Sequence, residues 1–425
     1  MSKLSYLEKL LDGVEVEWLS LDNISEKISS GGTPRTSVPE YYDGNIPWLR
    51  TQEIDFGDIW DTGIKITEAG VKDSSAKWIP ANCIIIAMYG ATVGKIGINK
   101  IPMTTNQACA NVALNSKLAD YKYVFHFLSS QYEYIKSLGS GSQTNINAAI
   151  VKKLLIPIPC PNNPEKSLAI QSEIVRILDK FTALTAELTA ELNMRKKQYN
   201  YYREQLLSFN EGEMEWKTLG DVTKKWYSGG TPTAGNPEYY QGGDIPWLRT
   251  QEVKFSDIER TEIKVTQAAL DNSSAKWIPA NCLIIAISGA TAGRSAINKI
   301  PLTTNQHCGC LEIDNSKALY RYAFHWVSYN YENIKALGQG ARGDLNSTII
   351  KNFKFPIPFS DDPEKSLKEQ ARIVSILDKF DTLINSITEG LPREIELRQK
   401  QYEYYRDLLF NFPKVEGALS KENAQ

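Results

Sequence analysis

The chain has 425 residues and a formal net charge of −2, with 48 basic side chains against 50 acidic ones. A duplex DNA-binding protein that works alone is usually basic on its contact face, so this balance argues mildly against such a protein. It does not exclude a local basic surface or a partner that supplies most phosphate contacts. No apolar run approaches the ~18 residues of a membrane span, and the start lacks a signal-peptide core, so we expect a cytoplasmic protein.

A duplication organises the chain. The eight residues IPWLRTQE occupy 46–53 and return at 245–252, 199 positions later. The same spacing relates SSAKWIPANC at 74–83 to its copy at 273–282. Each copy is far longer than the roughly 20–50 residues of a solenoid repeat and is large enough for a core of its own.

The repeat predicts alternating globular and helical segments in chain order. These are an N-terminal helix stub at 1–13, a first domain at 14–160, a helical spacer at 161–211, a second domain at 212–359, a second helical spacer at 360–413 and a tail at 414–425.

The N-terminal stub indicates that the repeat is cyclic. Ser5–Leu11 precedes the first domain as Tyr201–Leu207 precedes the second, so the stub corresponds to the end of a repeat whose remainder lies at the C-terminus. We therefore expect the helix at Tyr402–Phe412 to end beside Met1–Leu11, in a closed molecule with a pseudo-two-fold axis.

Each domain mixes short β-type runs with Gly, Pro and Asn. Cys83–Met88 (CIIIAM) predicts a buried strand, and Tyr121–Ser130 predicts an amphipathic helix rich in aromatic residues. Leu154–Pro159 predicts an edge strand, because its prolines cannot donate to a central ladder. Together these elements predict an α+β domain with long polar loops.

The spacers carry the seam of a coiled coil. In the first, steps of four and three join Ile170, Ile174, Ile177, Phe181, Leu184 and Leu188. In the second, they join Ile373, Ile376, Phe380, Leu383 and Ile387. EGLPRE at 389–394 should break or kink the second helix, with Pro392 tolerated in a fresh first turn. We expect two antiparallel helices of about 45 residues in an intramolecular coiled coil; an ordinary dimerisation coiled coil is the alternative.

Catalytic motifs are not recognisable. GATVGK at 90–95 has one residue too few between its glycines for a phosphate loop and lacks the Ser or Thr that holds magnesium, so we interpret it as a turn. His126 and His325 lie at matched positions inside an aromatic helix, where a packed histidine is expected rather than a ligand. The six cysteines form no C-x-x-C pair and are interpreted as reduced core residues. We expect neither a catalytic residue nor a metal site.

The ordered motifs closely resemble one known family. They are SGGTP, IPWLRTQE, SSAKWIPANC, YGATVGKIGI, TTNQAC, LGSGSQTNIN, QSEIVRILDKF and RKKQYNYYREQLL, several of them present twice between Val14 and Phe412. This set resembles the specificity subunit of Type I restriction–modification enzymes.

The resemblance implies two target-recognition domains, each reading one half of a bipartite double-stranded DNA sequence. The helices separate the domains and dock two modification (methyltransferase) subunits. The partners, which include restriction/translocase subunits, are expected to carry S-adenosylmethionine, ATP and Mg²⁺, and this chain no cofactor. The resemblance thus implies a non-catalytic subunit whose docking helices include Ile174, Phe181, Tyr199, Tyr202, Ile373, Phe380, Tyr402 and Tyr405.

Polar loops are the candidates for reading DNA, because hydrogen bonds to base edges need amide, hydroxyl or basic side chains. In the first domain the candidates are Thr33, Arg35, Arg50, Gln52, Tyr89, Lys95, Ser142, Gln143 and Asn145. In the second they are Thr231, Arg249, Gln251, Ser288, Arg294, Gln339, Arg342 and Asp344. Scaffold is the alternative for these loops, with Trp48, Trp78, Trp247 and Trp277 as core aromatics. The copies diverge at Tyr89 against Ser288, and at 142–145 against 341–344, so base preference should differ there.

Two similar domains inverted by an antiparallel rod should read similar half-sequences in inverted orientation, which predicts a nearly palindromic site with a gap. Two rival functions remain. A single-chain restriction or modification enzyme would need nucleotide or metal motifs. A tandem carbohydrate- or protein-binding module on a coiled-coil scaffold is suggested by the tyrosine and tryptophan content.

Overall fold

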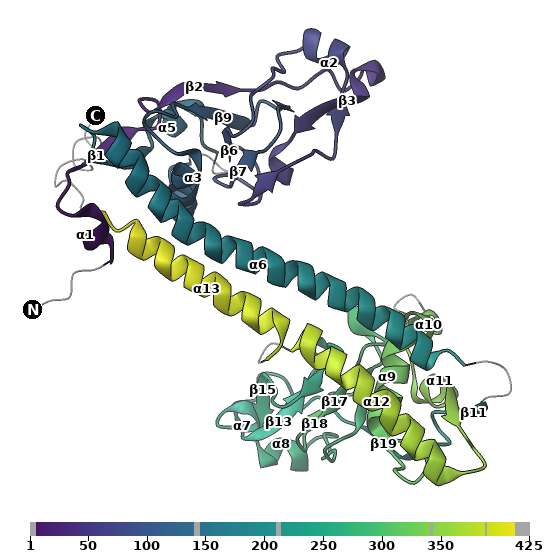
Figure 1. Ribbon diagram of the computed structural model, residues 1–425. Helices are drawn as coiled ribbons and strands as arrows, with labels where there is room; N and C mark the ends of the chain where they lie inside the picture. The colour runs from purple at the N-terminus through teal and green to yellow at the C-terminus, as the bar shows by residue number, and fades with distance from the viewer. Residues whose placement is uncertain (1–5, 140–144, 210–213, 341–342, 387–388, 413–425) are drawn as a thin grey trace, which may run out of the picture. The chain divides into compact units, whose positions relative to one another are not determined.

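The structure is a computed structural model, described for residues 6–139, 145–209, 214–340, 343–386 and 389–412. It divides into two compact units, residues 1–187 with 395–425 and residues 188–394. Each unit contains one sheet-bearing domain, and the 44-residue helix α6 (Pro164–Leu207) joins the two along the chain (Figure 1). The fold is α+β, and the duplicated sequence forms a duplicated structure.

The first domain is built on three small sheets. The five-stranded sheet has the order β2-β9-β6-β7-β4, the three-stranded sheet β5-β3-β8, and a separate ribbon pairs β1 with β10. The strands are β1 Val16–Ser20, β2 Ser25–Ser30, β3 Tyr42–Leu49, β4 Asp58–Ile59, β5 Lys65–Ile66, β6 Ile84–Ala87, β7 Ile96–Asn99, β8 Thr104–Thr105, β9 Cys109–Leu114 and β10 Leu155–Pro159. The helices are α1 Tyr6–Leu11, α2 Glu68–Lys72, α3 Tyr121–Ser130, α4 Tyr132–Ser137 and α5 Ala148–Lys153, with short 3-10 turns η1 Pro39–Tyr41 and η2 Thr51–Glu53.

The second domain repeats this topology. Its sheets have the orders β12-β19-β16-β17-β14, β15-β13-β18 and β11-β20. The strands are β11 Met214–Thr218, β12 Thr223–Ser228, β13 Ile245–Leu248, β14 Asp257–Ile258, β15 Ile263–Val265, β16 Leu283–Ala286, β17 Ser295–Asn298, β18 Thr303–Thr304, β19 Cys308–Ile313 and β20 Lys354–Pro358. The helices and 3-10 turns are α7 Pro237–Tyr240, η3 Thr250–Glu252, α8 Gln267–Asp271, η4 Gly289–Thr291, α9 Tyr320–Tyr329, α10 Tyr331–Ala336 and α11 Ser347–Lys351. The second spacer consists of α12 Pro363–Asn385 and α13 Leu391–Leu409, and α13 from Ile395 onward belongs to the first unit.

The three elements predicted from local patterns are confirmed. CIIIAM contains β6, whose four residues are all buried in the middle of the five-stranded sheet. Helix α3 spans the predicted residues, and its first turn is capped by the Asp120 carboxylate, which accepts hydrogen bonds from the Lys122 and Tyr123 amides. Strand β10 pairs with β1 in a two-stranded ribbon, where its prolines leave no central ladder bond unmade.

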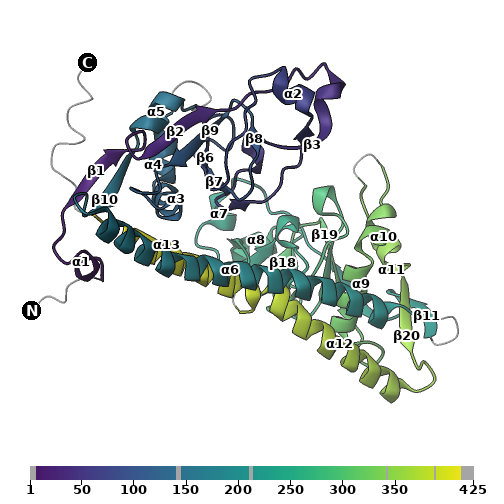
Figure 2. The same cartoon turned by 45° about the horizontal axis from the view of Figure 1, so that its top comes forward.

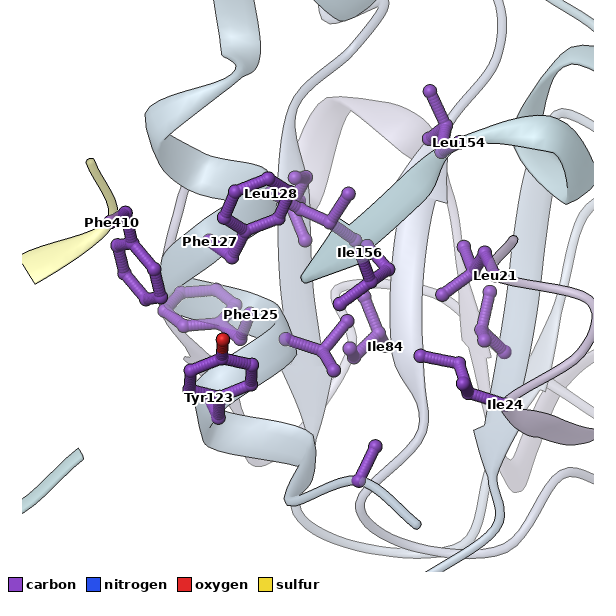
Figure 3. Packing of buried hydrophobic residues seen from close by; sticks show 14 of the residues in the cluster. Leu21, Ile24, Ile84, Tyr123, Phe125, Phe127, Leu128, Leu154, Ile156 and Phe410 are labelled. Carbon is purple, nitrogen blue, oxygen red and sulfur yellow. The ribbon is translucent and has the colours of Figure 1, made fainter. Parts of the chain in front are cut away.

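The aromatic face of α3 forms the core of the first domain. Tyr123 and Phe127 each lie 5.4 Å from the ring of Phe410, between centroids. Figure 3 shows these rings on one side of the core and Ile84 with Leu21 on the other. Full burial of one such side chain contributes about 1.5–3 kcal/mol, so this cluster holds the helix and the sheet together.

The predicted closure of the chain is confirmed for the described residues. Leu7 and Leu11 of α1 are buried in the same core cluster as Leu409, Phe410 and Phe412. Helix α1 and the end of α13 therefore complete the first domain together (Figures 1 and 2). Met1–Ser5 of the predicted stub lie outside the described residues.

The long helices pair within the chain in both units. In the first unit, Phe181 of α6 stacks on Tyr405 of α13, with ring centroids 5.1 Å apart. The two helix segments of this unit run side by side in opposite directions in both views (Figures 1 and 2). In the second unit, Tyr202 of α6 stacks on Phe380 of α12 at 5.5 Å. The predicted intramolecular pairing is thus confirmed by matched aromatic stacks.

The second spacer is broken where the sequence predicted. Helix α12 ends at Asn385 and α13 starts at Leu391, so Pro392 lies in the first turn of the new helix. Gly390 between them has φ +88°, and a Cβ there would collide with the Thr382 carbonyl. Because only glycine adopts this conformation without strain, Gly390 and Pro392 together set the interruption. Ile387 of the predicted seam lies outside the described residues.

The tryptophans correct one prediction. Trp48 and Trp247 are core residues, as expected, and their indole N–H groups donate to the Gly32 and Gly230 carbonyls at 2.9 and 3.1 Å. Trp78 and Trp277, however, are 52% and 47% exposed. They lie on the loops of the SSAKW repeat, and about half of each side chain is open to solvent, so they are surface residues.

Candidate nucleic-acid interface

The Gly-Gly-Thr-Pro loops owe their glycines to close backbone packing. A Cβ on Gly31 would collide with the Thr105 carbonyl, and one on Gly229 would collide with the Thr304 carbonyl. The indole of Trp48 donates to the carbonyl of the next glycine, Gly32. The glycines are therefore scaffold, and their effect is to hold the following threonine at the surface.

That threonine orients a glutamine from a distant loop in both domains. The Thr33 hydroxyl donates to Oε1 of Gln107, and the Thr231 hydroxyl donates to Oε1 of Gln306 at 2.6 Å. All four side chains are exposed. An amide whose oxygen is fixed by a hydroxyl presents its NH2 group in a defined direction. The two glutamines were not among the predicted site residues, although the repeated TTNQ was a usable signal.

Arg50 and Arg249 form ion pairs with nearby glutamates of their own domains. Each guanidinium lies beside the glutamate three residues later, with Nε to Oε1 distances of 3.6 Å to Glu53 and 3.7 Å to Glu252. Arg249 also pairs with Glu262 at 2.6 Å. Their neighbours Gln52 and Gln251 are exposed on the 3-10 turns η2 and η3. Of these four candidates, the glutamines are therefore better placed to meet a ligand.

The Gly-Ala-Thr loops are tight turns between antiparallel strands, as predicted. Gly90 and Gly94 have φ values of +83° and +82°, and the Gly94 amide donates to the Ala87 carbonyl at 2.8 Å. Tyr89, which opens the first turn, is 39% exposed. Its counterpart Ser288 donates to or accepts from Nδ1 of His307 at 2.6 Å. His307 is a third polar residue of this surface that was not predicted.

The basic residues that end these turns are in different electrostatic settings. Lys95 makes an ion pair with Asp55 at 2.7 Å. Arg294 replaces Lys95 in the second domain, and Lys254 replaces Asp55. Over the described ranges, neither Arg294 nor Lys254 forms an ion pair, and the same holds for the exposed Arg35 of the first domain. These cations are therefore available to phosphate groups.

The last candidate loops adjoin the Gly-Ala-Thr turns. The Ile146 amide donates to the Met88 carbonyl at 3.0 Å, and the Leu345 amide donates to the Ile287 carbonyl at 2.7 Å. Oδ1 of Asn145 is buried and has no hydrogen-bond partner in the described part of the chain. Ser142, Gln143 and Arg342 lie outside the described residues.

In the second domain the same two loops border an open cavity. Gln339 and Asp344 face each other in a backbone bridge, with amide-to-carbonyl distances of 2.9 and 3.0 Å. Oδ1 of Asp344 also accepts from the Gly289 amide at 3.4 Å. The cavity of 470 Å³ is lined by Gly289, Ala290, Ala292, Lys335 and Gly343. Asp344 therefore supports the loop next to Ser288.

His126 and His325 are packed side chains, as predicted. Nε2 of His126 lies 3.0 Å from the Asp179 carboxylate, and Nδ1 lies 2.9 Å from the Tyr402 hydroxyl. Burial tends to raise the pKa of Asp179, but hydrogen bonds from His126 and Lys122 hold that pKa below its ordinary value. The contacts join α3, α6 and α13, so this cluster fastens the first domain to its helices.

The described core thiols are shielded from solvent. Burial raises the pKa of Cys83 to about 11 and that of Cys109 to about 12, which keeps both thiols protonated. No group of three or more His, Cys, Asp or Glu side chains with metal-binding geometry occurs in the part of the chain that the structure describes. In the same residues, no helix is long and apolar enough to cross a membrane.

The predicted docking residues fall into two groups. Ile174 and Ile373 are fully buried in the cores of their domains, so a partner cannot reach them in this structure. Tyr202 and Tyr405 are 39% and 41% exposed on the helices. The remaining four residues pack mainly against other parts of the chain. They are Phe181, Tyr199, Phe380 and Tyr402. Docking of partners thus stays a prediction for the exposed rings.

A model of the Type I restriction modification DNA specificity domain matches residues 13–195 and again residues 211–397. The chain belongs to this family. It is 44% identical to the EcoR124I/EcoR124II specificity subunit of Escherichia coli, with 98% of this chain and 99% of that protein covered. It is 38% identical to the EcoprrI specificity subunit of the same species, with 92% and 93% covered.

A solved S subunit of a Type I restriction–modification system from M. genitalium has the same fold. Its TM-score is 0.59 at 18% identity, and the match covers 95% of this chain and 98% of that one. The relatives confirm the family resemblance and the function of DNA-sequence recognition that it implied. None of these matches supports a carbohydrate- or protein-binding module.

Proposed function

We propose that this specificity subunit reads a bipartite, gapped DNA sequence, with each domain reading one half. The observation that supports this most directly is the repeated Thr–Gln pair, exposed on the same scaffold in both domains. Amide and hydroxyl groups held rigidly at a surface are suited to base edges in the major groove. The chain contributes recognition and leaves the chemistry to its partners.

The polar surface divides into two kinds of contact. Arg35, Lys254 and Arg294 make no ion pair in the described residues, and they position the protein on phosphates. The amide and hydroxyl side chains read bases. The net charge of −2 agrees with partners that share the phosphate contacts.

The partners are two modification subunits that dock on the long helices, together with restriction/translocase subunits. Tyr201 and Tyr404, at matched positions on α6 and α13, are 60% and 64% exposed. Exposed aromatic rings are enriched where proteins bind one another. S-adenosylmethionine, ATP and Mg²⁺ belong to those partner subunits.

The target is nearly palindromic in this proposal. Its support is the close similarity of the two domains and the cyclic order of the repeat, which predicts inverted half-sites. The test is to map methylated adenines in host DNA with and without this gene. Two related, inverted half-sequences at a constant spacing are expected. Unrelated half-sites would contradict the palindrome, and methylation without any gapped sequence would contradict the proposed function.

A further inference from the structure

The two domains differ at a pair of chain segments that extend the central strands. In the first domain the Met88 amide donates to the Ala108 carbonyl at 2.8 Å, just beyond β6 and β9. In the second, the Ile287 amide donates to the His307 carbonyl at 2.9 Å. The backbone hydrogen bonds match in the two domains. The residue with a ring side chain, however, lies on the first segment in one domain and on the second segment in the other. Position 89 is Tyr where position 288 is Ser, and position 108 is Ala where position 307 is His, whose ring contacts Ser288. Such compensation is typical of residues that share one space across a pair of strands.

In the second domain these side chains form a continuous hydrogen-bonded row. The Thr231 hydroxyl donates to Oε1 of Gln306 at 2.6 Å. Nε2 of Gln306 lies 3.3 Å from Nε2 of His307, and Nδ1 of His307 lies 2.6 Å from Oγ of Ser288. An amide NH2 group only donates, so the imidazole Nε2 accepts. A neutral imidazole then carries its proton on Nδ1 and donates to Ser288. The row ends on the Ser288 hydroxyl, whose own proton stays available.

In the first domain the row stops one residue earlier. Thr33 still donates to Gln107, but Ala108 has no group that can bond to the amide nitrogen. In the described residues, neither that nitrogen nor the Tyr89 hydroxyl has a hydrogen-bond partner. The Gln107 amide therefore presents both of its protons and a free lone pair of its oxygen.

We propose that these matched sets decide which base each domain accepts at one position of its half-site. The first set is Tyr89, Gln107 and Ala108, and the second is Ser288, Gln306 and His307. This rests on the proposed function. Gln107 has the free donor and acceptor that suit adenine, which a glutamine binds through N6 and N7. In the second domain one amide proton is used on His307, and the Ser288 hydroxyl, which suits several bases, is added as a reading group beside the amide. His307 is a positioning residue that holds Ser288 and Gln306.

The consequence is an asymmetry between otherwise similar half-sites. One position should be restricted to adenine in the half read by the first domain and tolerate more than one base in the half read by the second. The remaining positions are contacted by other loops and are unaffected by this difference.

The experiment exchanges the sets in the complete methyltransferase complex and maps the methylated sequences. Ser288→Tyr with His307→Ala gives the second domain the side chains of the first, and Tyr89→Ser with Ala108→His does the reverse. Each double variant should change one position of one half-site toward the preference of the other domain. The other half-site and the gap should stay the same. Discrimination at that position should change about 5- to 150-fold, the size of one base contact.

Single variants serve as controls in case a double variant does not fold. His307→Ala should weaken discrimination at the one position while overall methylation persists, and Gln267→Ala, on helix α8, should leave the sequence unchanged because this side chain bonds to Asp271 on its own helix. Thermal unfolding of each complex confirms that the variants are folded. This inference would be overturned if folded His307→Ala and the folded double variants still methylated the wild-type sequence. The wild-type complex tests the proposed function separately, because its failure would appear as the absence of any gapped target.

Discussion

The two domains differ in charge beside the Gly-Ala-Thr turns, and this difference predicts unequal salt dependence. In the first, Asp55 neutralises Lys95 at 2.7 Å. In the second, Lys254 occupies the position of Asp55 and leaves Arg294 unpaired in the described residues. The surroundings match closely, since the ring of Phe56 meets Tyr132 and the ring of Phe255 meets Tyr331 at the same centroid distance of 5.1 Å. The substitution Lys254→Asp should therefore recreate the ion pair of the first domain around Arg294.

The magnitude follows from the number of phosphates that the variant no longer neutralises. If Lys254 and Arg294 each neutralise one phosphate, the slope of log K against log salt falls by about 0.9 for each of them, or about 1.8 in total. Between 50 and 200 mM salt, a fourfold range, that difference amounts to about a 12-fold change in relative affinity. The variant should bind more weakly than wild type at low salt, and its affinity should decrease less as salt rises.

The assay is equilibrium DNA binding by the complex with modification subunits over that salt range. Asp55→Lys is the matched reverse variant, because it frees Lys95 and should steepen the slope. Slopes equal to wild type in both variants would refute the assignment of these cations to phosphates. An equal decrease in affinity at every salt concentration would mean that Lys254→Asp disturbs the fold instead.

Three further predictions concern the helices and the core. Deleting the four residues 388–391, which include Gly390, should change the gap between the methylated half-sequences or abolish methylation, and an unchanged gap at full activity would contradict the prediction that the long helices set the gap. Phe410→Ala should lower the free energy of unfolding of the first domain by about 3–5 kcal/mol. Denaturant unfolding measures this loss, and hydrogen exchange shows which domain is affected. An equal loss of hydrogen-exchange protection in both domains would contradict the prediction. Asp179→Ala removes the acceptor of the buried His126 and should cost about 1–3 kcal/mol. The pKa of Asp179 is lower in the folded protein than its ordinary value, so this carboxylate stabilises the fold at pH values above the ordinary aspartate pKa. That stabilisation is lost as the pH falls through the folded pKa, so wild type and variant should converge in stability in acid. A stability difference that stays constant with pH would contradict this prediction.

Local patterns in the sequence determined the repeat, its cyclic order and the elements with strong periodicity. The run CIIIAM predicts a strand because it is short, apolar and β-branched, and the structure buries all of β6. Gly390 and Pro392 predict the helix interruption because glycine readily adopts a positive φ, whereas proline has a fixed φ and no backbone N–H. These properties depend on a few neighbouring residues, so they need no knowledge of the rest of the chain.

The positions of surface side chains were decided by tertiary structure. Trp48 and Trp78 are the same residue type in equally repeated motifs, yet the first is 5% exposed and the second 52%. Gln107 reaches Thr33 across 74 residues, because the loops that carry them are brought together by pairing of non-adjacent strands. His307 likewise meets Ser288 only because β16 and β19 pair side by side. The sequence alone determined that two similar sensing domains are joined by paired helices. Which polar atoms stand together on each domain depended on contacts between residues far apart in the chain, and no local periodicity encodes them.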